Sequence, residues 1–324
     1  MYIKKIIHPE YFQGNKKKKN YFEGWYYKLV SQYEDYTIAL IPGISLNHKD
    51  PHAFIQVFIS HLEEGDIKLK SHYFKFLTSE FEYGHDTFFV RIGKNFFSKE
   101  RIEISLKNEH LDLFGMIQIS DITPIKKSLL SPNIMGIFGY LNFMECYHGV
   151  ISMTHRLSGK FRLNHQIVSF EQSKGYIEKD WGKSFPSQYV WLQSNHFKKE
   201  DTSLMFSYAT IPFLGFSFKG LIVNLVFNQK EFRFATYNRA KVKYQDIKQG
   251  YVFYKIKKGR YQLEIVAVSK TEISLAAPKN GEMIDQIKEG LSGNIRIRLY
   301  KKNQLVYEDE GLHAGIEIMM HERK

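Results

Sequence analysis

A chain of 324 residues with 46 Lys and Arg against 34 Asp and Glu is long enough for two domains or one large β domain, and its basic balance favours anionic partners. Its single cysteine, Cys146, excludes an intrachain disulfide and a cysteine-rich zinc site. The sequence contains no run of about 18 apolar residues and no apolar signal-peptide core, so we expect a cytoplasmic protein.

Short apolar or alternating runs recur along the whole chain and are separated by turn residues. They include WYYKLV, TIALI, HAFIQVFIS, TFFVRI and RIEISL in the first part, and GVISMTH, YVWLQSN, SLMFSYATI, LIVNLVF and IRIRLY in the second. This spacing predicts meandering antiparallel strands and an all-β fold, because the helices that βαβ units require are missing. Residues 279–291, KNGEMIDQIKEGL, form the one segment with a helical pattern.

Residues 121–148 interrupt the strand pattern with two prolines and no alternation of apolar and polar residues. We interpret this segment as the crossing between two β domains. The predicted domains are residues 1–144 and 145–324. The lysine run 16–19 within the first domain is typical of a solvated loop.

Two segments place acids beside large aromatic residues. In YFEGWYYK, the period of two puts Glu23 and Trp25 on one strand face. In GYIEKDWGKSFPSQYVWLQSN, a first strand carries Tyr176, Glu178 and Asp180 on one face, and a second carries Tyr189, Trp191, Gln193 and Asn195. Turn residues between these two strands predict a hairpin that pairs the two faces.

Carboxyl groups on an inward face would meet in an apolar cavity. Burial and mutual repulsion would keep at least one of them protonated, so that it could deliver a proton to a carbon–carbon double bond. Aromatic faces could then stabilise the carbocation. In the alternative interpretation Glu178 and Lys179 face water and Asp180 caps the turn through backbone amides.

A histidine pair in FMECYHGVISMTHRLSG raises the question of a metal site. His148 and His155 are an odd number of residues apart, so in a regular strand they face opposite ways and cannot bind one ion together. We therefore expect no metal, and a buried, hydrogen-bonded His148. Neither a Gly-x-Ser-x-Gly elbow nor a glycine-rich nucleotide loop is present.

Three segments together resemble the tocopherol cyclase family: YFEGWYYK, SPNIMGIFGYLNFMECYHGVISMTHRLSG and GYIEKDWGKSFPSQYVWLQSNHF. The resemblance implies two lipocalin-like β barrels in tandem and a cofactor-free cyclisation, in which a prenyl double bond is protonated and a phenolic oxygen closes a ring. In the related hydratases, water traps the cation. The substrate itself is left open, because the source of this chain need not make tocopherol.

The resemblance and the acid–aromatic pattern together select the candidate residues. The candidate catalytic residues are Asp180, as proton donor, with Glu178 and Glu23. The candidate substrate-binding residues are Trp25, Tyr176, Trp181, Trp191, Gln193, Asn195 and His148. Strict alternation places Trp181 on the opposite face from Asp180, unless the following turn redirects it.

Two other functions remain open at this stage. A non-catalytic carrier of a hydrophobic ligand would use the same motifs for packing. Nucleic-acid binding requires aromatic residues within a localised basic groove, whereas the basic residues here are dispersed, so we expect no nucleic-acid partner. The expected partners are a small prenylated ligand and, through the basic surface, an anionic membrane.

Overall fold

The computed structural model of the protein describes residues 2–320. It is 67% strand and 5% helical, which confirms the all-β prediction. The helices are short: α1 (Tyr2–Ile7) and the single-turn segments η1 (Thr78–Glu80), η2 (Gly136–Tyr140) and η3 (Thr236–Asn238). Among residues 2–320, none of these helices has the length and apolar character needed to cross a bilayer.

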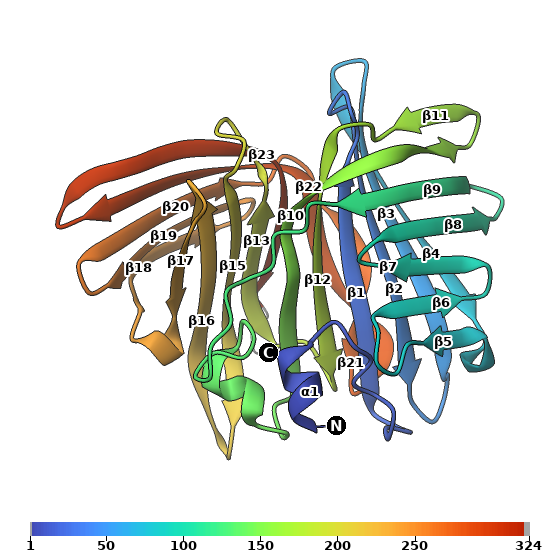
Figure 1. Ribbon diagram of the computed structural model, residues 1–324, viewed down its shortest axis with the longest axis horizontal. Coiled ribbons are helices and arrows are strands. Elements are labelled where there is room, and N and C mark those ends of the chain that lie inside the picture. The colour runs from blue at the N-terminus through green and yellow to red at the C-terminus, as the bar shows by residue number, and fades with distance from the viewer. Residues whose placement is uncertain (1, 321–324) are drawn as a thin grey trace. The chain divides into compact units, whose positions relative to one another are not determined.

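The first sheet is antiparallel and curls into a nearly closed barrel (Figure 1). Its order is β4-β3-β2-β1-β12-β10-β9-β8-β7-β6-β5, and β11 pairs with β10. The strands are β1 (Tyr21–Val30), β2 (Tyr36–Leu46), β3 (His52–Glu63), β4 (Asp66–Phe76), β5 (Phe81–Tyr83), β6 (Phe89–Ile92), β7 (Asn95–Ser98), β8 (Arg101–Lys107), β9 (Asp112–Ser120), β10 (Cys146–Leu163), β11 (Gln166–Ser169) and β12 (Ser173–Gly182).

The second sheet is also antiparallel, in the order β17-β16-β15-β13-β23-β22-β20-β19-β18, with β14 paired to β23 and β21 paired to β22. Its strands are β13 (Gln188–Ser194), β14 (His196–Phe197), β15 (Ser203–Phe213), β16 (Phe216–Phe227), β17 (Lys230–Ala235), β18 (Lys241–Lys248), β19 (Tyr251–Lys258), β20 (Tyr261–Val268), β21 (Ile273–Lys279), β22 (Glu282–Lys301) and β23 (Gln304–Met320).

The predicted helix over residues 279–291 is wrong. Asn280 and Gly281 have φ angles of 52° and 78° and form a tight turn, from which β22 continues as an extended strand. An Asn-Gly pair is the strongest short-range hairpin signal, and here it overrides the helical spacing of the residues that follow.

The two compact units of the chain are divided differently from the predicted domains. One unit comprises the residues up to 135 together with 145–185 and 276–286; the other comprises 136–144, 186–275 and the residues from 287 on. The predicted boundary lies near residue 145, yet β10 pairs with β9 and β12 pairs with β1. Backbone pairing therefore places residues 145–185 with the first unit.

A buried ion pair lies inside the first barrel. Glu23 on β1 and Lys179 on β12 have fully buried side chains, and Lys179 Nζ contacts Glu23 Oε1. The register places Trp25 opposite Lys179 and Trp181 opposite Glu23, so all four share one sheet face. Lys179 Nζ lies 4.6 Å from the ring centroid of Trp25 and 4.8 Å from that of Trp181. The ammonium group is thus enclosed by two indole rings, which attract cations.

The same ammonium group holds the N-terminal segment against the barrel. Lys179 Nζ donates hydrogen bonds to the carbonyl oxygens of Pro9, at 2.8 Å, and Tyr11, at 2.6 Å. Between these two contacts, the indole N–H of Trp25 donates to the carbonyl oxygen of Glu10 at 2.9 Å. A segment without regular secondary structure is therefore fixed by side chains from two strands.

Glu23 completes this arrangement. Its carboxylate accepts hydrogen bonds from the backbone N–H groups of Gln13 and Gly14 at 2.8–3.0 Å and from the hydroxyl of Tyr21 at 2.5 Å. Burial lowers the pKa of Lys179 to about 8, although the Glu23 carboxylate opposes this change. Because every polar atom of the pair has a partner, both charges are tolerated in the barrel core.

The Glu23–Lys179 pair generates the first testable expectation. Removing one partner leaves an uncompensated buried charge, so Glu23→Gln should lower the free energy of unfolding by about 3–5 kcal/mol. The double variant Glu23→Gln/Lys179→Met should lose less than the sum of the two single variants. Urea unfolding followed by tryptophan fluorescence measures this, and a loss below about 1 kcal/mol for Glu23→Gln would contradict the assigned role.

Candidate active site

The face of β12 opposite Lys179 carries a second group of polar side chains. Period-two alternation places Tyr176, Glu178 and Asp180 together on this face, as the sequence predicted. The neighbouring strand β10 brings His148 directly opposite Asp180. The group is therefore built from two adjacent strands of one sheet, which fixes the spacing of its members.

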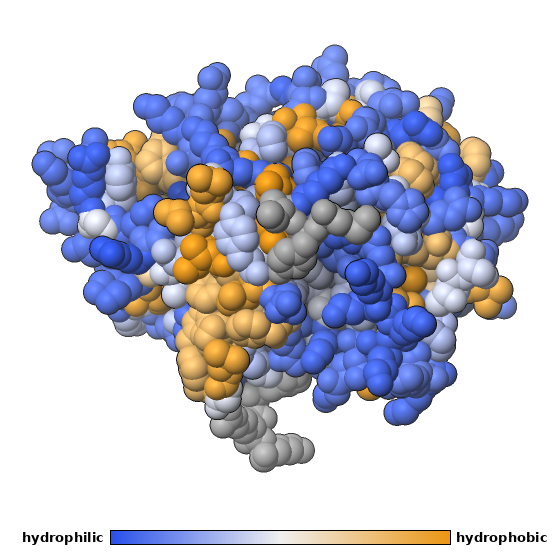
Figure 2. Space-filling view, turned by 60° about the horizontal axis from the view of Figure 1, so that its bottom comes forward, coloured by the Kyte–Doolittle hydropathy of each residue, from blue (hydrophilic) through white to orange (hydrophobic). Residues whose placement is uncertain are grey.

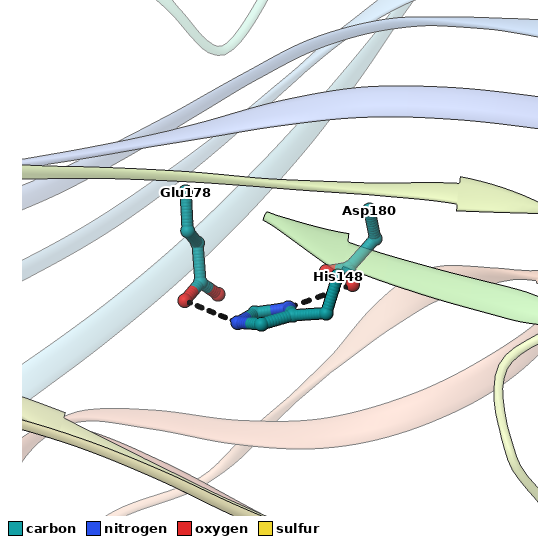
Figure 3. Close-up of side chains that lie close together, drawn as sticks. All are labelled: His148, Glu178 and Asp180. Carbon is teal, nitrogen blue, oxygen red and sulfur yellow. Dashed lines mark hydrogen bonds and ion pairs between the residues drawn. The ribbon is translucent and has the colours of Figure 1, made fainter. Parts of the chain in front are cut away.

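His148, Glu178 and Asp180 form a contiguous group, which we call the His148 triad (Figure 3). His148 Nδ1 lies 2.9 Å from Asp180 Oδ1 in a hydrogen bond, and His148 Nε2 lies 3.5 Å from Glu178 Oε2. The hydroxyl of Tyr176 donates a hydrogen bond of 2.5 Å to Glu178 Oε2. The imidazole ring thus lies between two carboxyl groups, one of which is oriented by a tyrosine.

The triad controls the charge of the imidazole. Burial alone would lower the pKa of His148, but the carboxylates of Asp180 and Glu178 and the hydrogen bond to Asp180 outweigh burial and raise the pKa to about 9. His148 is therefore an imidazolium ion at neutral pH. Two acids and one retained proton give the group acid–base capacity in a largely buried setting.

One nitrogen of His148 makes no hydrogen bond within the described part of the chain. The contact between Nε2 and Glu178 lacks hydrogen-bond geometry, and Nε2 is buried without a hydrogen-bond partner among residues 2–320. Buried N–H groups normally have partners, so an unpartnered one calls for an explanation. In an imidazolium ion both nitrogens donate, and Nε2–H is the group of the triad that a bound molecule would satisfy.

Glu23, Trp25 and Trp181 do not join the triad. They share the face of β1 and β12 that points into the barrel core, where packed side chains fill the space around them. The expectation that Glu23 converges with Glu178 and Asp180 in one apolar cavity is therefore wrong, because the registers of the two strands place them on opposite faces. The alternation that separates Trp181 from Asp180 is confirmed.

The predicted hairpin between the two strands of residues 175–195, now β12 and β13, is also wrong. Strand β12 pairs with β1 and β10, whereas β13 pairs with β15 and β23 of the other sheet. The residues after Gly182 therefore connect two sheets and do not form a tight turn between paired strands. Consequently the faces of β12 and β13 are not paired with each other.

Trp191, Gln193 and Asn195 belong to the second unit. All three side chains are buried, and both polar atoms of the Gln193 amide have no hydrogen-bond partner within the described range 2–320. Asn224, two strands away, has a similarly unpartnered amide nitrogen. The role of the three predicted residues in substrate binding stays a prediction, to which the unpartnered amide of Gln193 lends support.

Sequence reasoning did not single out two residues of these faces. Lys179 was expected to face water in one interpretation, yet it is fully buried. Tyr26 lies directly opposite Glu178 on the triad face and is 8% exposed. The alternation of side chains along β12 already places Lys179 on the same face as Trp181, which indicates burial. Its partner Glu23 could be identified only from the pairing of β1 with β12.

The triad could in principle bind a cation. Its three residues each offer one ligand atom, and these atoms lie within 4.8 Å of one another; among residues 2–320, no other group of His, Cys, Asp and Glu side chains meets this condition. Both imidazole nitrogens of His148 are directed at carboxyl oxygens, and the imidazole is protonated at neutral pH. A metal ligand must be the neutral imidazole. The side chains as arranged therefore suit a proton better than a metal ion.

The family model for tocopherol cyclase-like proteins matches residues 128–319. The matched region contains the whole triad and covers more than half of the chain. The protein therefore belongs to the tocopherol cyclase-like family. No curated protein sequence gives a significant match to the chain.

Solved structures of other proteins share the fold at low sequence identity. CghA with Sch210972 matches with a TM-score of 0.60 and 9% identity, over 94% of this chain and 89% of that chain. A protein designated AttH from Nitrosomonas europaea matches with a TM-score of 0.51 and 12% identity, over 92% of this chain and 93% of that chain. Kievitone hydratase from Nectria haematococca matches with a TM-score of 0.50 and 11% identity, over 95% of this chain and 93% of that chain. These similarities show the fold alone, which is the lipocalin-like tandem-barrel fold that the sequence predicted.

The raised pKa of His148 makes stability depend on pH. The folded protein holds this proton to about pH 9, whereas the ordinary pKa of histidine is 6.5, so the stabilisation is complete below pH 6.5 and is lost as pH rises towards 9. The pKa of Lys179 shifts in the opposite direction, from 10.5 to about 8, and this shift changes the free energy of unfolding with pH mainly above pH 8. Between pH 6.5 and 8, we expect the urea midpoint of the wild type to fall more steeply than that of His148→Gln. Equal slopes would show that the triad does not hold the proton.

The preference of the triad for a proton gives a second expectation. Treatment with EDTA should leave catalytic turnover and thermal stability unchanged, because the imidazole of His148 holds a proton at neutral pH and is not free to bind a metal ion. A loss of turnover that is reversed by one divalent cation would instead assign the triad as a metal site.

Proposed function

We propose that this protein is an acid–base enzyme of the cyclase or hydratase type, in which the His148 triad protonates a carbon–carbon double bond of an isoprenoid substrate. The observation that carries the proposal is the buried imidazolium of His148 between the carboxyl groups of Asp180 and Glu178. Membership of the tocopherol cyclase-like family supports the reaction class. The proposed substrate class, which the family suggests, is a quinol or another hydroxyl compound with a prenyl chain.

In the proposed reaction the proton that the triad holds on His148 passes along the hydrogen bond from Nδ1 to Asp180, and Asp180 delivers it to the double bond, whose π electrons form the new C–H bond. The oxygen of a hydroxyl group, from the substrate itself in cyclisation or from water in hydration, then forms a C–O bond with the resulting carbocation. That oxygen releases its proton to the Asp180 carboxylate, which returns it to His148 and so restores the imidazolium. Atoms and charge balance without an oxidant or reductant.

Each neighbour of Asp180 has a definite role in this scheme. His148 holds the proton and transfers it to Asp180 Oδ1 through the hydrogen bond from Nδ1, so that Asp180 is protonated at the moment of reaction. Tyr176 orients Glu178, the second acceptor for the returning proton. The ring of Tyr26 lies on the same sheet face, where an aromatic ring can stabilise a carbocation.

A turnover assay with a prenylated quinol tests the role of Asp180. Asp180→Asn keeps the shape of the side chain but removes the carboxyl group that passes the proton from His148 to the substrate, so kcat should fall by about 10²- to 10⁴-fold. Asp121→Asn is the matched control, because Asp121 is an exposed residue of the same unit with a φ of 53°, which asparagine tolerates.

Equal turnover by Asp180→Asn and the wild type would remove Asp180 from the mechanism. Recovery of a bound ligand that is chemically unchanged after prolonged incubation with the wild type would favour the alternative function, a carrier without catalysis.

A further inference from the structure

We infer that the turn between β15 and β16, together with η2, forms a docking surface for an anionic phospholipid bilayer. This inference concerns the second unit alone and does not rest on the proposed chemistry. Five phenylalanines form a continuous aromatic cluster at this place, which we call the aromatic tip: Phe138, Phe143, Phe213, Phe216 and Phe218.

The aromatic tip is held together by ring contacts. Phe213 lies centrally, with ring centroids of Phe143, Phe216 and Phe218 at 5.6, 5.5 and 5.9 Å. Phe138 of η2 stacks on Phe218 at 5.5 Å. These distances suit offset and edge-to-face pairs, so the cluster is a defined element and not a set of independent side chains.

Much of this apolar surface is exposed. Leu214 is 73% exposed, Phe216 60% and Phe143 50%, and the neighbouring Ile137 and Tyr140 of η2 are 48% and 41% exposed. Figure 2, which brings the lower part of Figure 1 towards the viewer, shows hydrophobic residues gathered in one area of this face. Scattered apolar residues on a surface are ordinary, whereas a contiguous patch marks an interaction site.

The turn residue Leu214 is anomalous for a turn in water. Its φ is 48° and that of Gly215 is 89°, a conformation in which Asn, Asp and Gly are favoured. The equivalent turn between β16 and β17 has Asn228 and Gln229 at positive φ, and the turn between β22 and β23 has Lys302 and Asn303. An exposed leucine in this position is disfavoured by both the backbone and the solvent, but it suits a turn that enters the acyl region of a membrane.

Charge identifies the kind of bilayer. Residues 136–144, 186–275 and 287–324 carry 21 Lys and Arg against 12 Asp and Glu, a net charge of +9 out of the total of +12. Lys219 lies three residues after Phe216 on β16, and exposed Arg239 directly follows η3, whose Tyr237 packs against Gly136 of η2. Cations beside an apolar tip match the anionic headgroups around inserted side chains.

Sedimentation with vesicles tests the docking surface. The wild type should sediment with vesicles of phosphatidylcholine and phosphatidylglycerol at low salt, and less with phosphatidylcholine alone or at high salt. Leu214→Asn/Phe216→Ser should weaken vesicle affinity about tenfold or more, since two large apolar side chains no longer leave water. Asparagine is favoured at positive φ, so the turn itself should be retained.

The matched control is Leu305→Asn/Val306→Ser, which removes two comparably exposed apolar side chains, 51% and 47%, from another hairpin of the same unit. This variant should bind vesicles as the wild type does. Lys219→Gln should lose about fivefold in affinity for the anionic vesicles and little for neutral ones.

Three results would overturn the inference. The wild type could sediment equally with and without vesicles, or the Leu214→Asn/Phe216→Ser variant could bind as the wild type does. Light scattering after size-exclusion chromatography without lipid could also show a wild-type dimer that the tip variant abolishes, which would assign the aromatic tip to a second copy of the chain. Loss of turnover in Asp180→Asn bears on none of these results.

Discussion

Successive side chains of a β-strand point to opposite faces of its sheet, and this constraint on β12 organises the chemistry of the protein. Lys179 is directed into the barrel core, where Glu23 and two indole rings receive its charge. Its neighbours Glu178 and Asp180 are directed to the other face, where they meet His148. A slip of one residue in the pairing would exchange the two environments and leave an ammonium group against an imidazolium ion. The charges therefore help to fix the register.

The two faces have different tasks although their residues are contiguous in sequence. The core face has every charged atom paired and attaches the N-terminal segment to the barrel, which is an arrangement for stability. The triad face holds a proton on His148 and leaves Nε2 without a hydrogen-bond partner among the described residues, which is an arrangement for reaction. An acid–base site needs a proton that it can transfer, whereas a buried ion pair is tolerated only when each of its polar atoms has a hydrogen-bond partner.

The sequence predicted the strands and the shared face of Glu178 and Asp180 because both depend on local periodicity. It could not predict which strands become neighbours. Placing Glu23 with Asp180 failed because the register of β1 against β12 is a long-range property, and the hairpin with β13 failed because two strands close in sequence entered different sheets. The helical interpretation of residues 279–291 failed for a local reason, since the Asn280–Gly281 turn was given less weight than the apolar spacing after it.

The central claim is that Asp180 and Glu178 hold a proton on His148. Histidine-selective NMR during a pH titration measures this directly, with the signal assigned by its absence in His148→Gln. We expect the His148 imidazole of the wild type to titrate near pH 9, to titrate at lower pH in Asp180→Asn, and to be unchanged in Asp121→Asn. A wild-type His148 that titrates near its ordinary value of about 6.5, or one that Asp180→Asn leaves unchanged, would contradict it.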